Sequence, residues 1–305
     1  GMFMQYLRSG DRRAYHIAQD MTLHFMNIDI CHYATNESYI GGIYEHAIGH
    51  SGGYYSESPF SSGIGITSPY PVHYGHWNVE ALLMHYSLTG DTRALSMAQR
   101  AVTRYNGEVL NQPYDWFTET RKPGWFLINT MAAYDLTLDP YYLNAATLIV
   151  ERVLERQNSL GGWPRLLAGG HCPHDDKPCI GNAGFAVAVL LDGLSMYHRI
   201  TGCPEVKESI INGARFLVRE FWNGELYRYT SCTSMKYAYT MDIGAIISYA
   251  AKLSGDEELF HIAYMTLKDE LKGDFTKVKH QGKSLGNFMR RTPHILVELR
   301  ECKNL

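Results

Sequence analysis

The sequence lacks the patterns that mark several common protein classes. No apolar run approaches the roughly 18 residues that a membrane-spanning helix needs. The formal net charge is −3, and no basic stripe suggests a nucleic-acid partner. A phosphate loop, a dinucleotide fingerprint and a Gly-x-Ser-x-Gly elbow are also missing. We therefore expect a soluble protein with no membrane or nucleic-acid partner and no cofactor.

Cysteine is sparse, with six residues and no Cys-x-x-Cys pair, which excludes a disulfide scaffold. The stretch 171–179 is rich in Cys, His and Asp, but its spacing matches no common zinc pattern. Glu45-His46-x-x-x-His50 also lacks the His-Glu-x-x-His order of zinc proteases. No metal site is predicted. The sequence does not begin with a signal-peptide pattern, and it does not indicate in which cellular compartment the protein resides.

Aromatic residues are plentiful, with 22 tyrosines and five tryptophans, many of them in predicted loops beside Gly, His and Asn. Flat apolar rings with polar rims suit the binding of sugars. A tyrosine-rich helical core would give the same composition, so composition alone leaves both interpretations open.

One sequence repeat occurs five times. It consists of an apolar helix pattern, a short turn that is usually Gly-Asp, and a second helix pattern. The copies lie at residues 7–15, 87–95, 135–143, 199–206 and 252–260. Glycine in the turn can take the left-handed conformation that ends a helix, and aspartate can cap the next one. These aspartates are therefore predicted to be caps and not catalytic groups. Repeated helical hairpins define the architecture.

Helix patterns are expected at about 11–26, 76–89, 91–105, 123–137, 140–157, 183–200, 204–220, 238–253, 256–271 and 284–300. The long loops, at 27–72, 106–120 and 161–182, all precede the first helix of a hairpin, whereas the turns inside hairpins are short. This asymmetry predicts an all-α, incomplete (α/α)5-6 toroid of helical hairpins with long loops on one end. We expect residues 1–305 to form a single domain, as a fragment of a longer multidomain protein.

Loop residues on the expected functional end suggest two kinds of chemistry. Glycoside hydrolysis needs a pair of carboxylates, for which Glu80, Asp115 and Glu119 are candidates. Elimination needs a base, for which His76 and Tyr54 are candidates. Glu80 could instead be favoured by the dipole at a helix start, and the segment around Glu119 could be a helix cap with a surface ion pair.

Aromatic, cationic and imidazole side chains in the same loops are predicted to bind the substrate. Two arginines could hold a carboxylate of the substrate, and the rings could stack on sugar faces. The predicted binding residues are His46, His50, His73, Trp77, Trp116, Arg121, Trp125, Trp163, Arg165 and Tyr229.

The chain resembles the six-hairpin glycosidase and polysaccharide lyase superfamily. Three segments carry the resemblance: His73–Leu95, Arg121-Lys-Pro-Gly-Trp125 and Gly161-Gly-Trp163. They look most like the helical domain of exo-rhamnogalacturonan lyase-like (YetA-like) proteins, over roughly residues 7–270. The resemblance implies an acidic, uronate-bearing glycan as the partner. It also implies additional β domains in the full-length protein, which this chain lacks.

The predicted function is a carbohydrate-active enzyme domain that acts on an acidic oligo- or polysaccharide by β-elimination or glycoside hydrolysis. The alternative is a non-catalytic glycan-binding or scaffold domain of a larger enzyme. The spacing of the candidate residues does not separate lyase from hydrolase.

Overall fold

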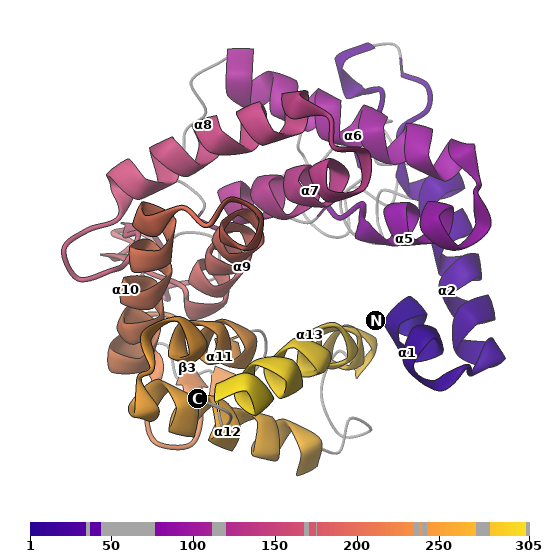
Figure 1. The fold of residues 1–305 in the computed structure, drawn as a ribbon. Helices are drawn as coiled ribbons and strands as arrows, with labels where there is room; N and C mark the ends of the chain where they lie inside the picture. Colours follow the sequence, from indigo (N-terminus) through magenta and orange to yellow (C-terminus); the bar gives the residue numbers. More distant parts are fainter. Residues whose placement is uncertain are drawn as a thin grey trace. The chain divides into compact units, whose positions relative to one another are not determined.

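The structure, a computed structural model, describes residues 1–34, 37–43, 77–111, 120–167, 171–174, 176–234, 238–239, 243–272 and 281–302. α-Helices dominate these residues (Figure 1). They are α1 (Met2–Ser9), α2 (Arg12–His24), α5 (Glu80–Thr89), α6 (Thr92–Asn111), α7 (Arg121–Thr137), α8 (Pro140–Arg156), α9 (Gly184–Thr201), α10 (Pro204–Phe221), α11 (Ile243–Ser254), α12 (Glu257–Lys272) and α13 (Gln281–Cys302). No described helix is both long and apolar enough to cross a membrane.

The Gly-Asp turns have the predicted conformation. Gly10, Gly90, Gly202 and Gly255 all have positive φ values, between 66° and 74°. Each of them donates its backbone N–H to the carbonyl four residues earlier, which closes the preceding helix. These four repeats are therefore helical hairpins with a glycine at the end of the first helix.

The aspartates of the turns are helix caps, as predicted. Asp11 accepts a hydrogen bond from the Arg13 backbone N–H at 2.9 Å. Asp256 accepts from the Glu258 N–H at 3.1 Å and from the Leu259 N–H at 3.3 Å. These bonds satisfy donors at the helix start that have no partner within the helix.

Two helix boundaries differ from the predicted ones for physical reasons. α6 continues to Asn111, beyond the predicted end near residue 105, because Asn106 and Val109 extend its buried face. α11 begins at Ile243 rather than near residue 238, because Ala238 and Tyr239 form strand β4. Within the predicted loop 27–72, Phe25–Asp29 form a π-helix, and Ile30 pairs with Ile43 in an antiparallel bridge.

The chain divides into two compact units. Unit 1 comprises Gly1–Met4, Asp115–Leu127 and Ile149–Leu305, and unit 2 comprises Gln5–Tyr114 and Ile128–Leu148. In unit 1, α9 and α11 carry fully buried apolar stretches, and α11 contacts α9, α10, α12 and α13. In unit 2, α5 packs on α2 and α6 around buried residues that include Leu82 and Val102.

A backbone contact joins α7 and α9 in unit 1. A Cβ atom added to Gly124 would lie only 2.5 Å from the Val189 carbonyl oxygen. A Cβ on Gly193 would lie 2.8 Å from the Gly124 carbonyl oxygen. Side-chain-free positions on both helices therefore let the two backbones touch, and this contact fixes the start of α7 against the middle of α9.

Short strands in unit 1 order the loops before α9 and α11. β1 (Arg165–Leu166) pairs with β2 (Ile180–Gly181), and β3 (Tyr227–Arg228) pairs with β4 (Ala238–Tyr239), both antiparallel. The two loops are also joined to each other, because Gly184 donates its N–H to the Tyr229 carbonyl at 3.0 Å. The hairpin β1–β2 had no counterpart in the predicted elements.

Candidate functional site

Eight of the predicted site residues lie outside the described residues. These are His46, His50, Tyr54, His73, His76, Asp115, Trp116 and Glu119. Their predicted roles stay predictions. The described candidates are Trp77 and Glu80 in unit 2, and Arg121, Trp125, Trp163, Arg165 and Tyr229 in unit 1.

Glu80 begins α5 and forms a reciprocal pair with Asn78. The Asn78 amide oxygen accepts from the Glu80 backbone N–H at 2.8 Å, and the Glu80 carboxylate accepts from the Asn78 amide at 2.9 Å. The side chain is partly buried. This geometry fits the structural interpretation of Glu80 as an acidic group at a helix start, and it leaves a catalytic role as a prediction.

Trp77 is a core residue. Its side chain is 1% exposed and stacks on Tyr105 with ring centroids 4.2 Å apart. Asn129 reinforces this packing, since its amide donates to the Trp77 carbonyl at 3.0 Å and accepts from the Val79 N–H at 2.7 Å. Both faces of the indole are taken up by the core, so the predicted stacking of Trp77 on a sugar is not supported.

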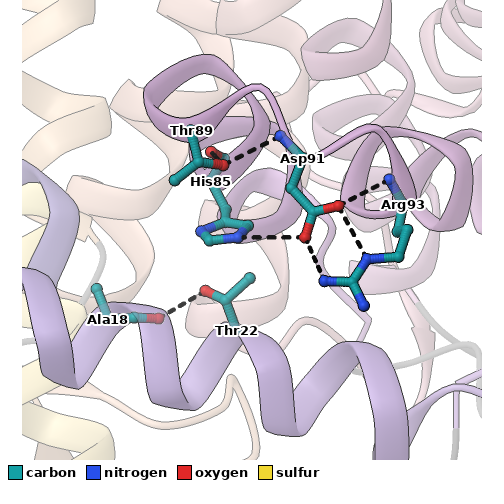
Figure 2. Close-up of polar contacts among 6 residues, drawn as sticks. All are labelled: Ala18, Thr22, His85, Thr89, Asp91 and Arg93. Carbon is teal, nitrogen blue, oxygen red and sulfur yellow. Dashed lines mark hydrogen bonds and ion pairs between the residues drawn. The ribbon is translucent and has the colours of Figure 1, made fainter.

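Asp91, at the turn between α5 and α6 in unit 2, contacts both Arg93 and His85 (Figure 2). It accepts from the Arg93 backbone N–H at 3.0 Å and from the Arg93 guanidinium at 2.7 and 3.0 Å. The hydrogen bond from the Arg93 side chain outweighs burial and lowers the pKa of Asp91 to about 2. His85, with its Nε2 3.8 Å away, adds a further contact. Asp91 is a permanently ionised cap, which makes it unsuitable as a proton donor.

In unit 1, the loop ends of α7 and α9 bring together a basic and aromatic group that we call the Phe185 cluster. The Phe185 and Tyr229 rings stack at 5.2 Å with an interplanar angle of 12°. His171 meets both rings edge-on, at 5.5 and 5.6 Å. The Arg121 guanidinium carbon lies 5.7 Å from the centre of the Phe185 ring. The cluster comprises Arg121, Arg165, His171, Phe185 and Tyr229.

Arg165 sets the hydrogen-bonding state of His171. An Nη atom of Arg165 lies 2.6 Å from His171 Nδ1. A guanidinium can only donate, so Nδ1 must accept, and the proton of the neutral ring resides on Nε2. Arg165 is 2% exposed, and its other Nη donates to the Leu166 carbonyl at 2.8 Å. The buried arginine thus orients the imidazole and fixes its tautomer.

The members of the Phe185 cluster differ in their exposure to solvent. Arg121, His171, Phe185 and Tyr229 are partly exposed, whereas Arg165 is buried. The cluster therefore offers one partly exposed cation, one partly exposed imidazole and two partly exposed rings. His171 and Phe185 were absent from the predicted site. Nothing in their local sequence distinguishes a loop histidine or a first-turn phenylalanine from a structural one.

Trp163 is 5% exposed, and its indole N–H donates to the Val153 carbonyl at 2.8 Å. Its backbone N–H donates to Asn182 at 2.9 Å. Trp163 therefore packs chiefly as a core residue, although one edge lines a pocket of about 110 Å³ with Arg152, Arg156 and Leu190 among its neighbours. No member of the Phe185 cluster lines this pocket. Trp125 lies in the first turns of α7 and is partly buried.

Four side chains next to the cluster could hold a metal ion. Cys172, His174, Cys179 and Cys232 have ligand atoms that all lie within 4.8 Å of one another. The sequence predicted no metal site, because the spacing within 171–179 matches no common zinc pattern, whereas the structure groups four ligand atoms of the kinds that bind a metal ion. The fourth member, Cys232, is 53 residues beyond Cys179, so the local spacing could not reveal it.

Comparisons with solved structures give the fold. The GH76A α-1,6-mannanase of Salegentibacter sp. HEL1_6, as an inactive variant in complex with α-1,6-mannotetrose, superposes with a TM-score of 0.63 at 15% identity. That match covers 95% of this chain and 84% of the mannanase. An unsaturated glucuronyl hydrolase mutant from Streptococcus agalactiae gives a TM-score of 0.60 at 11% identity, over 100% of this chain and 79% of the hydrolase.

No protein-family model and no curated protein matches the sequence. Identities of 11 and 15% support a conclusion about the fold alone. The chain has the all-α toroid fold of helical hairpins that was predicted for it.

Proposed function

We propose that this chain is a glycoside hydrolase domain that acts on an oligosaccharide bearing an acidic sugar. The Phe185 cluster is the observation that carries the proposal. It combines a partly exposed guanidinium with stacked, partly exposed rings and an oriented imidazole at the loop ends of two helices. Rings supply a flat apolar face for a sugar, and a guanidinium supplies a bidentate partner for a uronate carboxylate.

Hydrolysis is preferred to elimination because both similar structures are named as glycoside-cleaving hydrolases, a mannanase and a glucuronyl hydrolase. The mannanase is inactive when two adjacent aspartates are replaced, and its name therefore points to carboxylate chemistry in that protein. In this chain the proposed carboxylates are Asp115 and Glu119, which belong to the same unit as the Phe185 cluster. Arg121 would hold the uronate, with Tyr229 and Phe185 as the stacking face.

The test is to incubate the chain with a panel of acidic and neutral oligosaccharides while following ultraviolet absorbance and reducing ends together. Reducing ends without new absorbance are expected, and only with acidic substrates. New absorbance would reveal an unsaturated uronate and would replace hydrolysis with β-elimination. Binding without either signal would identify a glycan-binding domain instead.

Variants connect the activity to the Phe185 cluster. Arg121→Gln and Tyr229→Ala should each raise KM for an acidic oligosaccharide by about 10-fold or more, since each removes a contact worth about 1–3 kcal/mol. Arg12→Gln and Tyr264→Ala are matched controls, because both residues lie on exposed helix surfaces of α2 and α12. Unchanged KM values for both cluster variants would place the binding site elsewhere.

A further inference from the structure

Three thiols and one imidazole converge in the loops beside α9. Cys172 and His174 lie between β1 and β2, Cys179 directly precedes β2, and Cys232 follows β3. Cys172 and Cys232 are buried together with Leu167. His174 is exposed and Cys179 partly so, which leaves one side of the group open to solvent. The described cysteines here are all free thiols.

Five of the six distances between the ligand atoms lie within about 0.3 Å of those in a tetrahedron around one ion, and the sixth, between Cys172 Sγ and His174 Nδ1, is shorter. The three Sγ–Sγ distances are 3.5 Å, 3.6 Å and 3.8 Å. His174 Nδ1 lies 2.9 Å, 3.5 Å and 3.8 Å from the same sulfurs. A tetrahedral zinc ion with bonds of about 2.3 Å to sulfur and about 2.0 Å to nitrogen separates its sulfurs by ~3.8 Å and sulfur from nitrogen by ~3.5 Å.

The geometry points to a structural zinc ion bound by Cys172, His174, Cys179 and Cys232. Thiolate and imidazole are the ligands that structural zinc prefers, and four protein ligands close its coordination shell. The second nitrogen of His174 has its own partner, because Nε2 lies 3.4 Å from Ser234 Oγ. Such an outer hydrogen bond fixes the ring so that Nδ1 faces the metal.

The ion would join two loops that carry the Phe185 cluster. A backbone bond already connects them, since Ser231 N–H donates to the Asn182 carbonyl at 2.8 Å, and within the first loop Leu167 N–H donates to the Cys179 carbonyl at 2.8 Å. His171 directly precedes Cys172, and Tyr229 lies three residues before Cys232. Zinc would thus hold the imidazole and the tyrosine ring in place. The metal site itself does not depend on the proposed hydrolase activity.

Metal content is the first readout. The purified reduced chain, reconstituted with zinc and passed through a desalting column, should retain about one zinc per chain by elemental mass spectrometry. Cys179→Ser and Cys232→Ser should each lower this ratio to near zero. Cys203→Ser is the matched control, since Cys203 lies at the start of α10 with its thiol on Glu205, and it should keep the full ratio.

Cobalt provides a readout that needs no variant, in case a serine variant does not fold. The wild-type chain loaded with Co²⁺ should develop thiolate-to-metal charge-transfer bands and the visible bands of tetrahedral cobalt. Spectra with neither set of bands, or zinc retained by both serine variants, would overturn the proposal. Thiol counting by alkylation without reductant is the third readout, and a disulfide among the three cysteines of the reconstituted protein would also overturn it.

Discussion

Leu138 takes the position that glycine occupies in four of the five repeated turns. Its φ of 56° is the only positive value among the described non-glycine residues. The Leu138 side chain is 68% exposed, so packing does not offset the strain of the left-handed backbone. Replacement by glycine should remove that strain at the end of α7.

We expect Leu138→Gly to raise the free energy of unfolding by about 1 kcal/mol, since the strain relieved exceeds the added chain entropy of glycine. The reverse change, Gly90→Leu, should lower it by a similar amount, because Gly90 has a φ of 74° with open space around it. Urea denaturation of both variants and wild type measures the effect. A destabilised Leu138→Gly protein would contradict the argument.

Sequence reasoning succeeded at residues whose role is local and failed where it is tertiary. Capping by Asp11, Asp91 and Asp256 follows from turn chemistry, which needs only neighbouring residues. Trp77 is different, because the partner that buries it, Tyr105, belongs to another helix. The local sequence around a tryptophan at a helix start does not show whether the side chain contacts a sugar or packs in the core.

At the scale of elements, α13 is held to α9 by a buried ion-pair group in unit 1. Asp192 on α9 lies 2.5 Å from Arg291 and 3.2 Å from Arg290. Burial alone would raise the pKa of Asp192, but the charges of Arg291 and Arg290 outweigh it and hold the pKa well below its usual range. The carboxylate therefore stabilises the fold in its ionised form.

Asp192→Asn should lower the free energy of unfolding by about 3 kcal/mol at neutral pH, because it removes the negative charge from a buried ion-pair group that contains two arginines. The direction in which this stabilisation changes with pH follows from the lowered pKa of Asp192. The stabilisation is complete above the unfolded carboxyl pKa of about 3.9 and is lost as pH falls below it. Thermal melts from neutral pH downwards should show the gap between wild type and variant closing below about pH 4.

Glu301→Gln is the control on the same helix. Glu301 pairs with Lys252, but its side chain is 48% exposed, and an exposed pair contributes less than about 1 kcal/mol. If Glu301→Gln lowered the free energy of unfolding as much as Asp192→Asn does, burial would not explain why the Asp192 ion pairs stabilise the fold.

The helical elements were predictable because each repeat carries its own start and stop signals. The turn glycines and aspartates placed most helix ends within a few residues. The strands β1 to β4 span two residues each, too short for any alternating pattern, and their pairing depends on loops that come together in space. Three members of the Phe185 cluster (Arg165, His171 and Tyr229) and the whole cysteine group lie in or beside those short strands and loops, so local sequence patterns could not show that they come together.

At the scale of the whole molecule, a net charge of −3 is set against a locally basic cluster. If the ligand is the acidic oligosaccharide proposed above, its long-range attraction is weak, and nearby guanidinium groups would have to supply the attraction. Charges in close contact and partly desolvated are screened less than distant ones, yet still measurably.

The binding of an acidic oligosaccharide should accordingly weaken by several-fold as salt rises from about 0.01 M to about 1 M, where the Debye length falls to about 3 Å. Isothermal titration calorimetry at several salt concentrations measures this slope. A neutral oligosaccharide of the same length is the control and should show little change. If salt weakened the binding of both oligosaccharides equally, the proposed recognition of an acidic sugar by its charge would be wrong.

Backbone contact between α7 and α9 at Gly124 also limits how ligand preference can change during evolution. Arg121 lies three residues before Gly124, and Phe185 lies four residues before Val189, so each stands about one helical turn from the point of contact. The separation of the two helices sets how far apart the charge and the ring can lie. A widened site would need a side chain at Gly124, and every such step would also disturb the packing of the core.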